Sequence, residues 1–254
     1  MTPAEKKAVF LEKERQIRDK EEELLNIEHE PKAVDHFERL VLGQPNYSEH
    51  WVKYMAFHLQ GTEIEKARSV ARRALKQMNV REENERLNIW VALLNLENLY
   101  GTEESFKETL DEALKLSDDY QIRLKVLEIY SNSDKTRELE QLVSVMMRKY
   151  KTDMECQLAC LKALMKCGLS DKARQCLQKA LASFSSKQHV NLLSRFALIE
   201  NEYGHAVESH ALFESVLTSY PSRVDIWFIY VDMLIKAGSI TLARCLFSLS
   251  IICT

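Results

Sequence analysis

The stretch Trp51-Val-Lys-Tyr-Met-Ala-Phe-His-Leu-Gln-Gly61 decides the fold, because its pattern returns five more times along the chain. Apolar residues stand at its first, fourth and seventh positions, and this spacing places them on one face of a helix. The first anchors of the six copies are 39, 34, 34, 35 and 34 residues apart: Trp51, Trp90, Leu124, Leu158, Leu193 and Trp227. A helical repeat of about 34 residues predicts an all-α, right-handed α-solenoid of helix pairs.

Glycine marks the end of the first helix in five of the six copies, ten or eleven residues after the anchor: Gly61, Gly101, Gly168, Gly204 and Gly238. Glycine is common just past a helix end because it tolerates a positive φ angle. The remaining copy has Asn132-Ser133 at this place, and asparagine is the commonest substitute for glycine in that conformation. A second helix is expected after each turn, with a small residue such as Ala67 or Ala173 facing the first helix.

The repeat divides the chain into two parts. We expect about six helix pairs over residues 31–254, led by a single helix of the second type at 33–42. Residues 1–30 have dense alternating charge and few apolar residues, which predicts a charged helix or linker. This segment is either a solvated cap of the array or a docking helix.

Composition excludes several classes of protein. Hydrophobic residues make up 46% of the 254 residues, and six glycines and four prolines favour long helices over disorder or a turn-rich β-fold. The net charge of −3 does not fit an autonomous nucleic-acid binder. Apolar runs are too short for a membrane span, and the charged N-terminus does not resemble a secretory signal. We therefore expect no membrane partner.

No motif in the chain predicts catalysis or a cofactor. Cys156 and Cys160 are four residues apart on one expected helix, but no further histidine or cysteine has the spacing of a zinc site. The cysteines are therefore expected to be buried free thiols, with Cys176 on a core phase. His205 and His210 are five residues apart, which turns the two side chains away from each other on a helix. We expect no enzyme, metal site or cofactor.

Two groups of polar residues are candidates for binding a partner. Arg68, Arg72, Arg73 and Lys76 form a basic strip on one second helix, with the three arginines as the candidate contacts. The strip either touches phosphate or forms a solvated face paired with nearby glutamates. Asn95 and Asn98 place two amides on an otherwise apolar first helix. These amides either line the concave face of the array and bind a peptide backbone, or have a structural role between helices.

The repeated units resemble the half-a-tetratricopeptide, or HAT, repeat. The resemblance rests on the anchor pattern, often followed by glutamate as in Leu96-Glu97 and Ile199-Glu200, and on a second helix that contains Phe37-Glu-Arg-Leu40 or a similar motif. The run from Trp51 to Gly101 is also similar to the C-terminal HAT domain of a family of large nucleolar rRNA-biogenesis proteins. Later units keep the periodicity but replace many signature residues.

The resemblance implies a non-enzymatic scaffold in ribosome biogenesis that supports pre-rRNA processing. Such a scaffold is expected in the nucleus and nucleolus, in contact with pre-ribosomal proteins of the small-subunit processome and only weakly or indirectly with pre-rRNA. HAT arrays also serve splicing and mRNA 3′-end processing, and a generic tetratricopeptide-like peptide-binding adaptor is a further alternative. Lys53, Asn95 and Arg123 do not recur at one repeat phase, which argues against the charged clamp of such adaptors.

The end of the chain is unusually apolar. No charged residue follows Arg244, and the apolar side chains of Leu246-Phe-Ser-Leu-Ser-Ile-Ile-Cys253 cannot all face one neighbouring helix. Terminal repeats of a solenoid need a polar outer face. We expect an apolar patch that includes Phe247 and Ile251, in an array cut short of its natural cap, and self-association of the chain through this C-terminal end.

Overall fold

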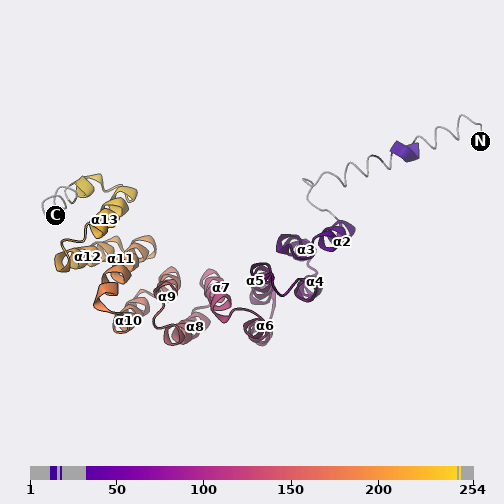
Figure 1. Ribbon diagram of the computed structural model, residues 1–254, viewed down its shortest axis with the longest axis horizontal. Helices are drawn as coiled ribbons and strands as arrows, with labels where there is room; N and C mark the ends of the chain where they lie inside the picture. Colours follow the sequence, from indigo (N-terminus) through magenta and orange to yellow (C-terminus); the bar gives the residue numbers. More distant parts are fainter. Residues whose placement is uncertain (1–11, 16–17, 19–32, 245, 247–254) are drawn as a thin grey trace, which may run out of the picture. The chain divides into compact units, whose positions relative to one another are not determined.

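The computed structural model describes residues 12–15, 18, 33–244 and 246, which form helices joined by short turns, with no β-strand among them (Figure 1). The chain divides into two compact units, Met1–Leu93 and Leu94–Thr254, and the division falls within α5 (Glu83–Tyr100). The expected charged segment at 1–30 lies almost entirely outside the described residues and stays a prediction.

The first unit contains α2 (Val34–Gly43), α3 (Ser48–Gln60), α4 (Ile64–Gln77) and the first part of α5. α2 packs on α3, and α3 packs on α4. A polar cluster joins the three helices, because Tyr54 Oη and Arg73 Nη2 both donate to Glu38 Oε1, at 2.7 and 2.8 Å. Burial and the bond to Glu38 raise the pKa of Tyr54 to about 12.

The second unit continues the alternation of first and second helices. Its elements are α6 (Glu103–Leu116), α7 (Asp119–Asn132), α8 (Thr136–Lys149), α9 (Met154–Lys166), α10 (Ser170–Leu181), α11 (Ser186–Tyr203), α12 (Ala206–Ser219) and α13 (Val224–Lys236). α7 packs on α8, α9 on α10 and α11 on α12, and α9 also contacts α7, α8 and α11. A first helix thus contacts its own second helix and the first helices of neighbouring repeats. The predicted all-α solenoid is confirmed.

Side-chain caps mark where several helices begin. Thr102, Asp118 and Asp153 accept backbone N–H groups at the starts of α6, α7 and α9. Ser185 and Gln188 form a capping box at the start of α11. These oxygens satisfy N–H groups that have no partner within the helix, so each helix can begin directly after a short turn.

The residues with a positive φ angle only partly match the expected glycines. Gly168 and Gly238 have φ angles of 74° and 78°, as predicted for residues just past a helix end. Gly61 has a φ of −80°, and its neighbour Thr62 takes the positive value of 58° instead. In the copy without glycine, Asp134 has the positive φ of 52°, so the left-handed residue lies just beyond the expected Asn132-Ser133.

Gly101 and Gly204 serve a different purpose, because the backbone there closes over a buried glutamate four residues earlier. A Cβ atom at Gly101 would lie 2.3 Å from Glu97 Oε2. A Cβ atom at Gly204 would lie 2.6 Å from Met165 Cε and 2.7 Å from Glu200 Oε1. Neither glycine has a positive φ angle, so the expected reason for glycine is wrong here, and close approach replaces it.

The three tryptophan anchors are buried, as the sequence predicts. The exposed fractions are 0% for Trp51, 1% for Trp90 and 8% for Trp227. Trp51 Nε1 donates to the carbonyl oxygen of Pro45 at 2.9 Å, and Trp227 Nε1 donates to that of Pro221 at 3.0 Å. The same contact therefore fixes the entry to the first helix in both repeats, and the rings contribute to the core rather than to base stacking.

Candidate functional site

The three arginines of the basic strip on α4 have different surroundings. Arg73 is half-buried, binds Glu38 and stacks over the aromatic rings of α3. Arg68 donates from Nη1 to Glu65 Oε1 at 2.5 Å. Arg72 is exposed and forms no ion pair with the residues that the structure describes. The strip is thus a partly salt-bridged face, and Arg72 and Lys76 are its free cations within the described part of the chain.

Asn95 and Asn98 are neighbours on α5 but differ in burial. They are three residues apart, which places them on the same side of the helix. Asn95 is exposed, whereas Asn98 is half-buried and its Oδ1 atom is buried without a partner among the described residues. The backbone carbonyl of Asn98 accepts a hydrogen bond from Lys135 Nζ at 3.3 Å. Asn95 is therefore the one placed to meet a partner, and Asn98 lies between helices.

A groove that includes neither the basic strip nor the two asparagines lies on the first helices of the second unit. We call it the first-helix groove. Its cavity volume is about 510 Å³. α7 and α9 form its walls, and Tyr203 at the end of α11 contributes to one side. Apolar contact surface comes from Leu124, Leu127, Ala159 and Ala163.

Two of the three lysines in the first-helix groove are paired with carboxylates of the protein. Lys162 Nζ lies 3.7 Å from Glu202 Oε2 and 5.3 Å from the centre of the Tyr203 ring. Lys125 Nζ lies 3.3 Å from Glu128 Oε2. The groove therefore offers an apolar strip beside two neutralised lysines, which suits the apolar face of a partner helix or peptide.

Sequence reasoning missed this groove because it assigns Leu124 to the core. Leu124 is half-buried and lines the groove. The repeat contains a sign of the groove, because Leu124 occupies the repeat position at which Trp51 and Trp90 have a larger side chain. Lys166, which also lines the groove, donates to Asn132 Oδ1, and this contact between two repeats has no signature in the sequence.

The cysteines of the described residues are free thiols. Cys156 and Cys160 are buried, as predicted, whereas Cys167 and Cys176 are half-buried. Cys176 therefore departs from the core position expected for it, and burial raises the pKa of its thiol. In the described part of the chain, no group of three or more His, Cys, Asp or Glu side chains is arranged to hold a metal ion.

Apolar side chains are exposed on α13 and on the residues that follow it. Phe228, Ile235, Ile240 and Leu242 are each more than half exposed, and the first three line a shallow groove. Phe247 and Ile251, which the sequence places in the expected apolar patch, lie outside the described residues.

Repeated helix pairs packed in this way define an α-solenoid of the HAT and tetratricopeptide class. Comparison with curated proteins makes the assignment more specific. The chain is 41% identical over 226 residues to the human "Protein RRP5 homolog", a match that covers 89% of this chain and 12% of that protein. It is 36% identical over 244 residues to "rRNA biogenesis protein RRP5" of Drosophila melanogaster, which covers 96% of this chain and 17% of that protein.

A fungal relative agrees with these two. The chain is 35% identical over 229 residues to "rRNA biogenesis protein rrp5" of Schizosaccharomyces pombe, which covers 90% of this chain and 13% of that protein. The chain is thus homologous to a segment of the RRP5 rRNA-biogenesis proteins, and the predicted family resemblance is confirmed.

The match concerns a small part of each relative. The chain spans 12% to 17% of the length of the curated relatives it matches. No family model matches the chain. Among the described helices, none combines the length and the apolar character needed to cross a bilayer.

Proposed function

We propose that this chain is a non-enzymatic scaffold in ribosome biogenesis, where its repeats hold protein partners during pre-rRNA processing and small-subunit assembly. The observation that carries the proposal is the identity of 35% to 41% with proteins named for rRNA biogenesis, over about nine-tenths of this chain. An array of helix pairs supports a binding role because it offers long grooves rather than an enclosed catalytic pocket. The corresponding location is the nucleus, and within it the nucleolus.

The first-helix groove is the proposed docking site for a protein of the small-subunit processome. Its apolar strip and the pairing of Lys125 and Lys162 with carboxylates favour a partner helix or peptide with an apolar face over a phosphate backbone. Asn95, exposed on another first helix, is a further candidate contact.

Contact with pre-rRNA is proposed to be weak in this segment. Arg73 and Arg68 are engaged within the protein, so that Arg72 is the arginine of the strip most available to a phosphate. An exposed arginine alone provides little affinity at physiological salt. The relatives' names favour rRNA processing over splicing, mRNA 3′-end processing or a generic peptide-binding adaptor.

Affinity purification of the tagged chain from nuclear extract tests the proposal. We expect pre-ribosomal proteins to co-purify, and Ala159→Arg to reduce their recovery, because Ala159 lines the first-helix groove and a long cation would block it. Gln175→Arg is the matched control, since it adds the same charge at an exposed position of α10. Recovery of spliceosomal or chaperone proteins instead would contradict the rRNA-processing role. Equal loss with both variants would contradict the role of the groove.

Self-association through the C-terminal end is a separate proposal. Its support is the exposed apolar surface of Phe228, Ile235 and Ile240. Light scattering over a range of concentrations should show oligomers for the unchanged chain and monomers for Phe228→Glu combined with Ile235→Glu. A monomer at high concentration without these changes would contradict self-association.

A further inference from the structure

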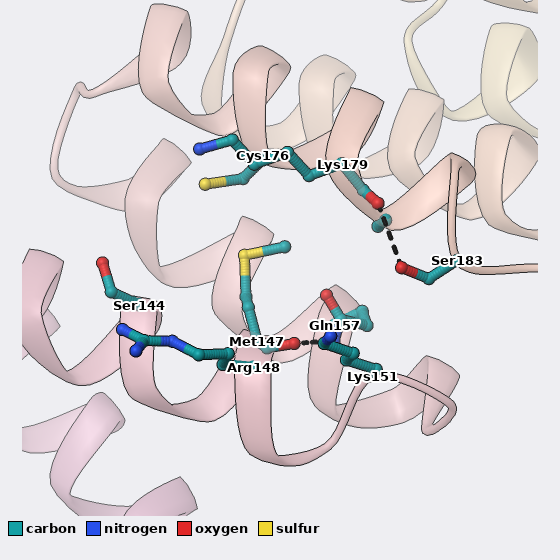
Figure 2. Close-up of a pocket in the computed structure, with 9 residues that line it drawn as sticks. Ser144, Met147, Arg148, Lys151, Gln157, Cys176, Lys179 and Ser183 are labelled. Carbon is teal, nitrogen blue, oxygen red and sulfur yellow. Dashed lines mark hydrogen bonds between the residues drawn. The ribbon is translucent and has the colours of Figure 1, made fainter.

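A second groove lies in the same unit, on the second helices between α8 and α10 (Figure 2), and we call it the second-helix groove. Its cavity volume is about 350 Å³. α8 and α10 each pack on α9, so that α9 forms the floor between them. Ser144 and Met147 of α8 face Cys176 of α10 across this space (Figure 2).

Three cations border the second-helix groove, and none of them has an ion-pair partner within the described residues. These are Arg148 at the end of α8, Lys151 just after it and Lys179 on α10, and all three are exposed. Lys149, between two of them in the chain, differs because its Nζ lies 2.7 Å from Asp119 Oδ2. The groove therefore has an excess of positive charge that the described part of the protein does not balance.

A buried amide provides a second, independent sign of a ligand. Gln157 of α9 lines the groove and is only 1% exposed. Its Nε2 donates to the carbonyl oxygens of Met147 and Tyr150, at 3.3 and 3.0 Å, and these two acceptors fix the orientation of the amide. The remaining Oε1 is buried and has no hydrogen-bond partner in the described residues. Buried polar groups normally have a partner, and this oxygen requires a donor.

The ligand must therefore combine negative charge with an N–H or O–H donor. An acidic peptide meets both needs, because its carboxylates pair with exposed cations and its backbone N–H groups are donors. The Met147, Cys176 and Ala180 side chains add apolar surface for its aliphatic groups. RNA fits less well, because binding of single strands depends on aromatic side chains that stack on bases, and the described residues that line this groove include no aromatic ring.

We propose that the second-helix groove binds an acidic peptide segment of a partner protein. The carboxylates of the segment pair with Arg148, Lys151 and Lys179, and one of its backbone N–H groups donates to Gln157 Oε1 after the flexible Met147 side chain moves aside. The site lies on the other type of helix from the first-helix groove. Because it is defined by its own chemistry, it does not depend on the proposed role in ribosome biogenesis.

Fluorescence anisotropy with the whole 254-residue chain tests the proposal. The probe is a labelled peptide of about a dozen residues in which Glu-Glu pairs alternate with Leu and Ala, at about 0.1 M salt so that distant charges are screened. We expect saturable binding. Changing Arg148, Lys151 and Lys179 together to Gln should weaken it about tenfold, since each exposed pair contributes a modest amount. Gln157→Met should also weaken it, with circular dichroism to show that the fold persists.

The matched control changes Lys125, Lys162 and Lys166 to Gln, which removes the same charge from the first-helix groove. This variant should bind the acidic probe as the unchanged chain does. The proposal is overturned if both triple variants weaken binding equally, because the attraction would then be non-specific. It is also overturned if binding does not saturate, or if a single-stranded RNA of equal charge binds more tightly and loses affinity with the second-helix variant.

Discussion

The two grooves of the second unit share α9 but differ in how many of their basic side chains have an ion-pair partner. In the first-helix groove, Lys162 is held by Glu202 and by the ring of Tyr203, and Lys125 is held by Glu128. In the second-helix groove, Arg148 and Lys179 have no ion-pair partner within the described residues. The second-helix groove thus has three cations without an ion pair among the described residues, whereas the first-helix groove has one, Lys166, although both carry three basic side chains.

The largest expected effect comes from the helix that the grooves share. Leu161 of α9 is fully buried, and Leu161→Ala should lower the free energy of unfolding by about 2–5 kcal/mol and weaken binding at both grooves. Urea denaturation followed by circular dichroism measures this loss. Leu198→Ala on α11 is the control and should change stability by less than about 0.5 kcal/mol, because Leu198 is exposed. A loss of binding at one groove alone would show that α9 does not support both.

A smaller loss of stability, with unequal effects on binding at the two grooves, is expected from a change at the end of α11. Gly204→Ala should lower stability by about 1–3 kcal/mol, because the new Cβ would lie 2.6 Å from Met165 Cε and 2.9 Å from the Glu200 carbonyl oxygen. Since Tyr203 is adjacent, binding at the first-helix groove should fall more than binding of the acidic probe. Gly43→Ala is the control, with no atom within 4 Å of its new Cβ. A stable Gly204→Ala protein would contradict the close approach.

The stability of the segment beside the second-helix groove should depend on pH through the carboxylate of Asp119. Burial alone would raise the pKa of Asp119, but hydrogen bonds from Lys149 and Tyr150 outweigh it and hold the pKa below its ordinary value. The carboxylate therefore stabilises the fold above the unfolded-state pKa of about 4, and this contribution is lost as pH falls through the lower folded-state pKa.

Asp119→Asn should lower stability by about 1–2 kcal/mol at neutral pH and loosen the end of α8 beside Arg148. Urea midpoints measured from pH 7 downward should converge for the two proteins in acid. Asp111→Asn, at an exposed position of α6, should show no such trend. A constant difference at every pH would mean that shape rather than charge explains the loss.

The smallest effect is expected at Lys162. Its side chain is half exposed, and exposed ion pairs contribute little, so Lys162→Gln should change the free energy of unfolding by less than about 1 kcal/mol. Thermal unfolding at low and high salt measures this. A larger loss would indicate that the contacts with Glu202 and Tyr203 support the packing of α9 on α11 as well as neutralising the groove.

The sequence predicts the repeated scaffold well because each signal for it is local. The phase of Trp51, Trp90 and Trp227 follows from helical periodicity, and all three are buried. The grooves depend instead on residues distant in the chain. Arg73 was a candidate for phosphate, but its partner Glu38 lies 35 residues earlier and a single helix gives no sign of that contact.

Gln157 illustrates the same limit in the second-helix groove. Its place on α9 follows from the repeat, but the carbonyl groups that hold its amide belong to the end of α8 and the turn after it. Only the packing of α8 and α10 on α9 reveals that this side chain lines a groove. The prediction therefore succeeds where one helix determines the outcome and fails where three helices meet.

The burial of the tryptophans gives the molecule built-in optical reporters. The rings lie in α3, α5 and α13, and only Trp51 and Trp227 donate to a proline carbonyl. Trp90 Nε1 is buried without such a partner in the described residues. Because each repeat of a solenoid contacts only its neighbours, the array can open in stages along its length. Tryptophan fluorescence of variants that keep only one of the three rings would follow the unfolding of each segment separately.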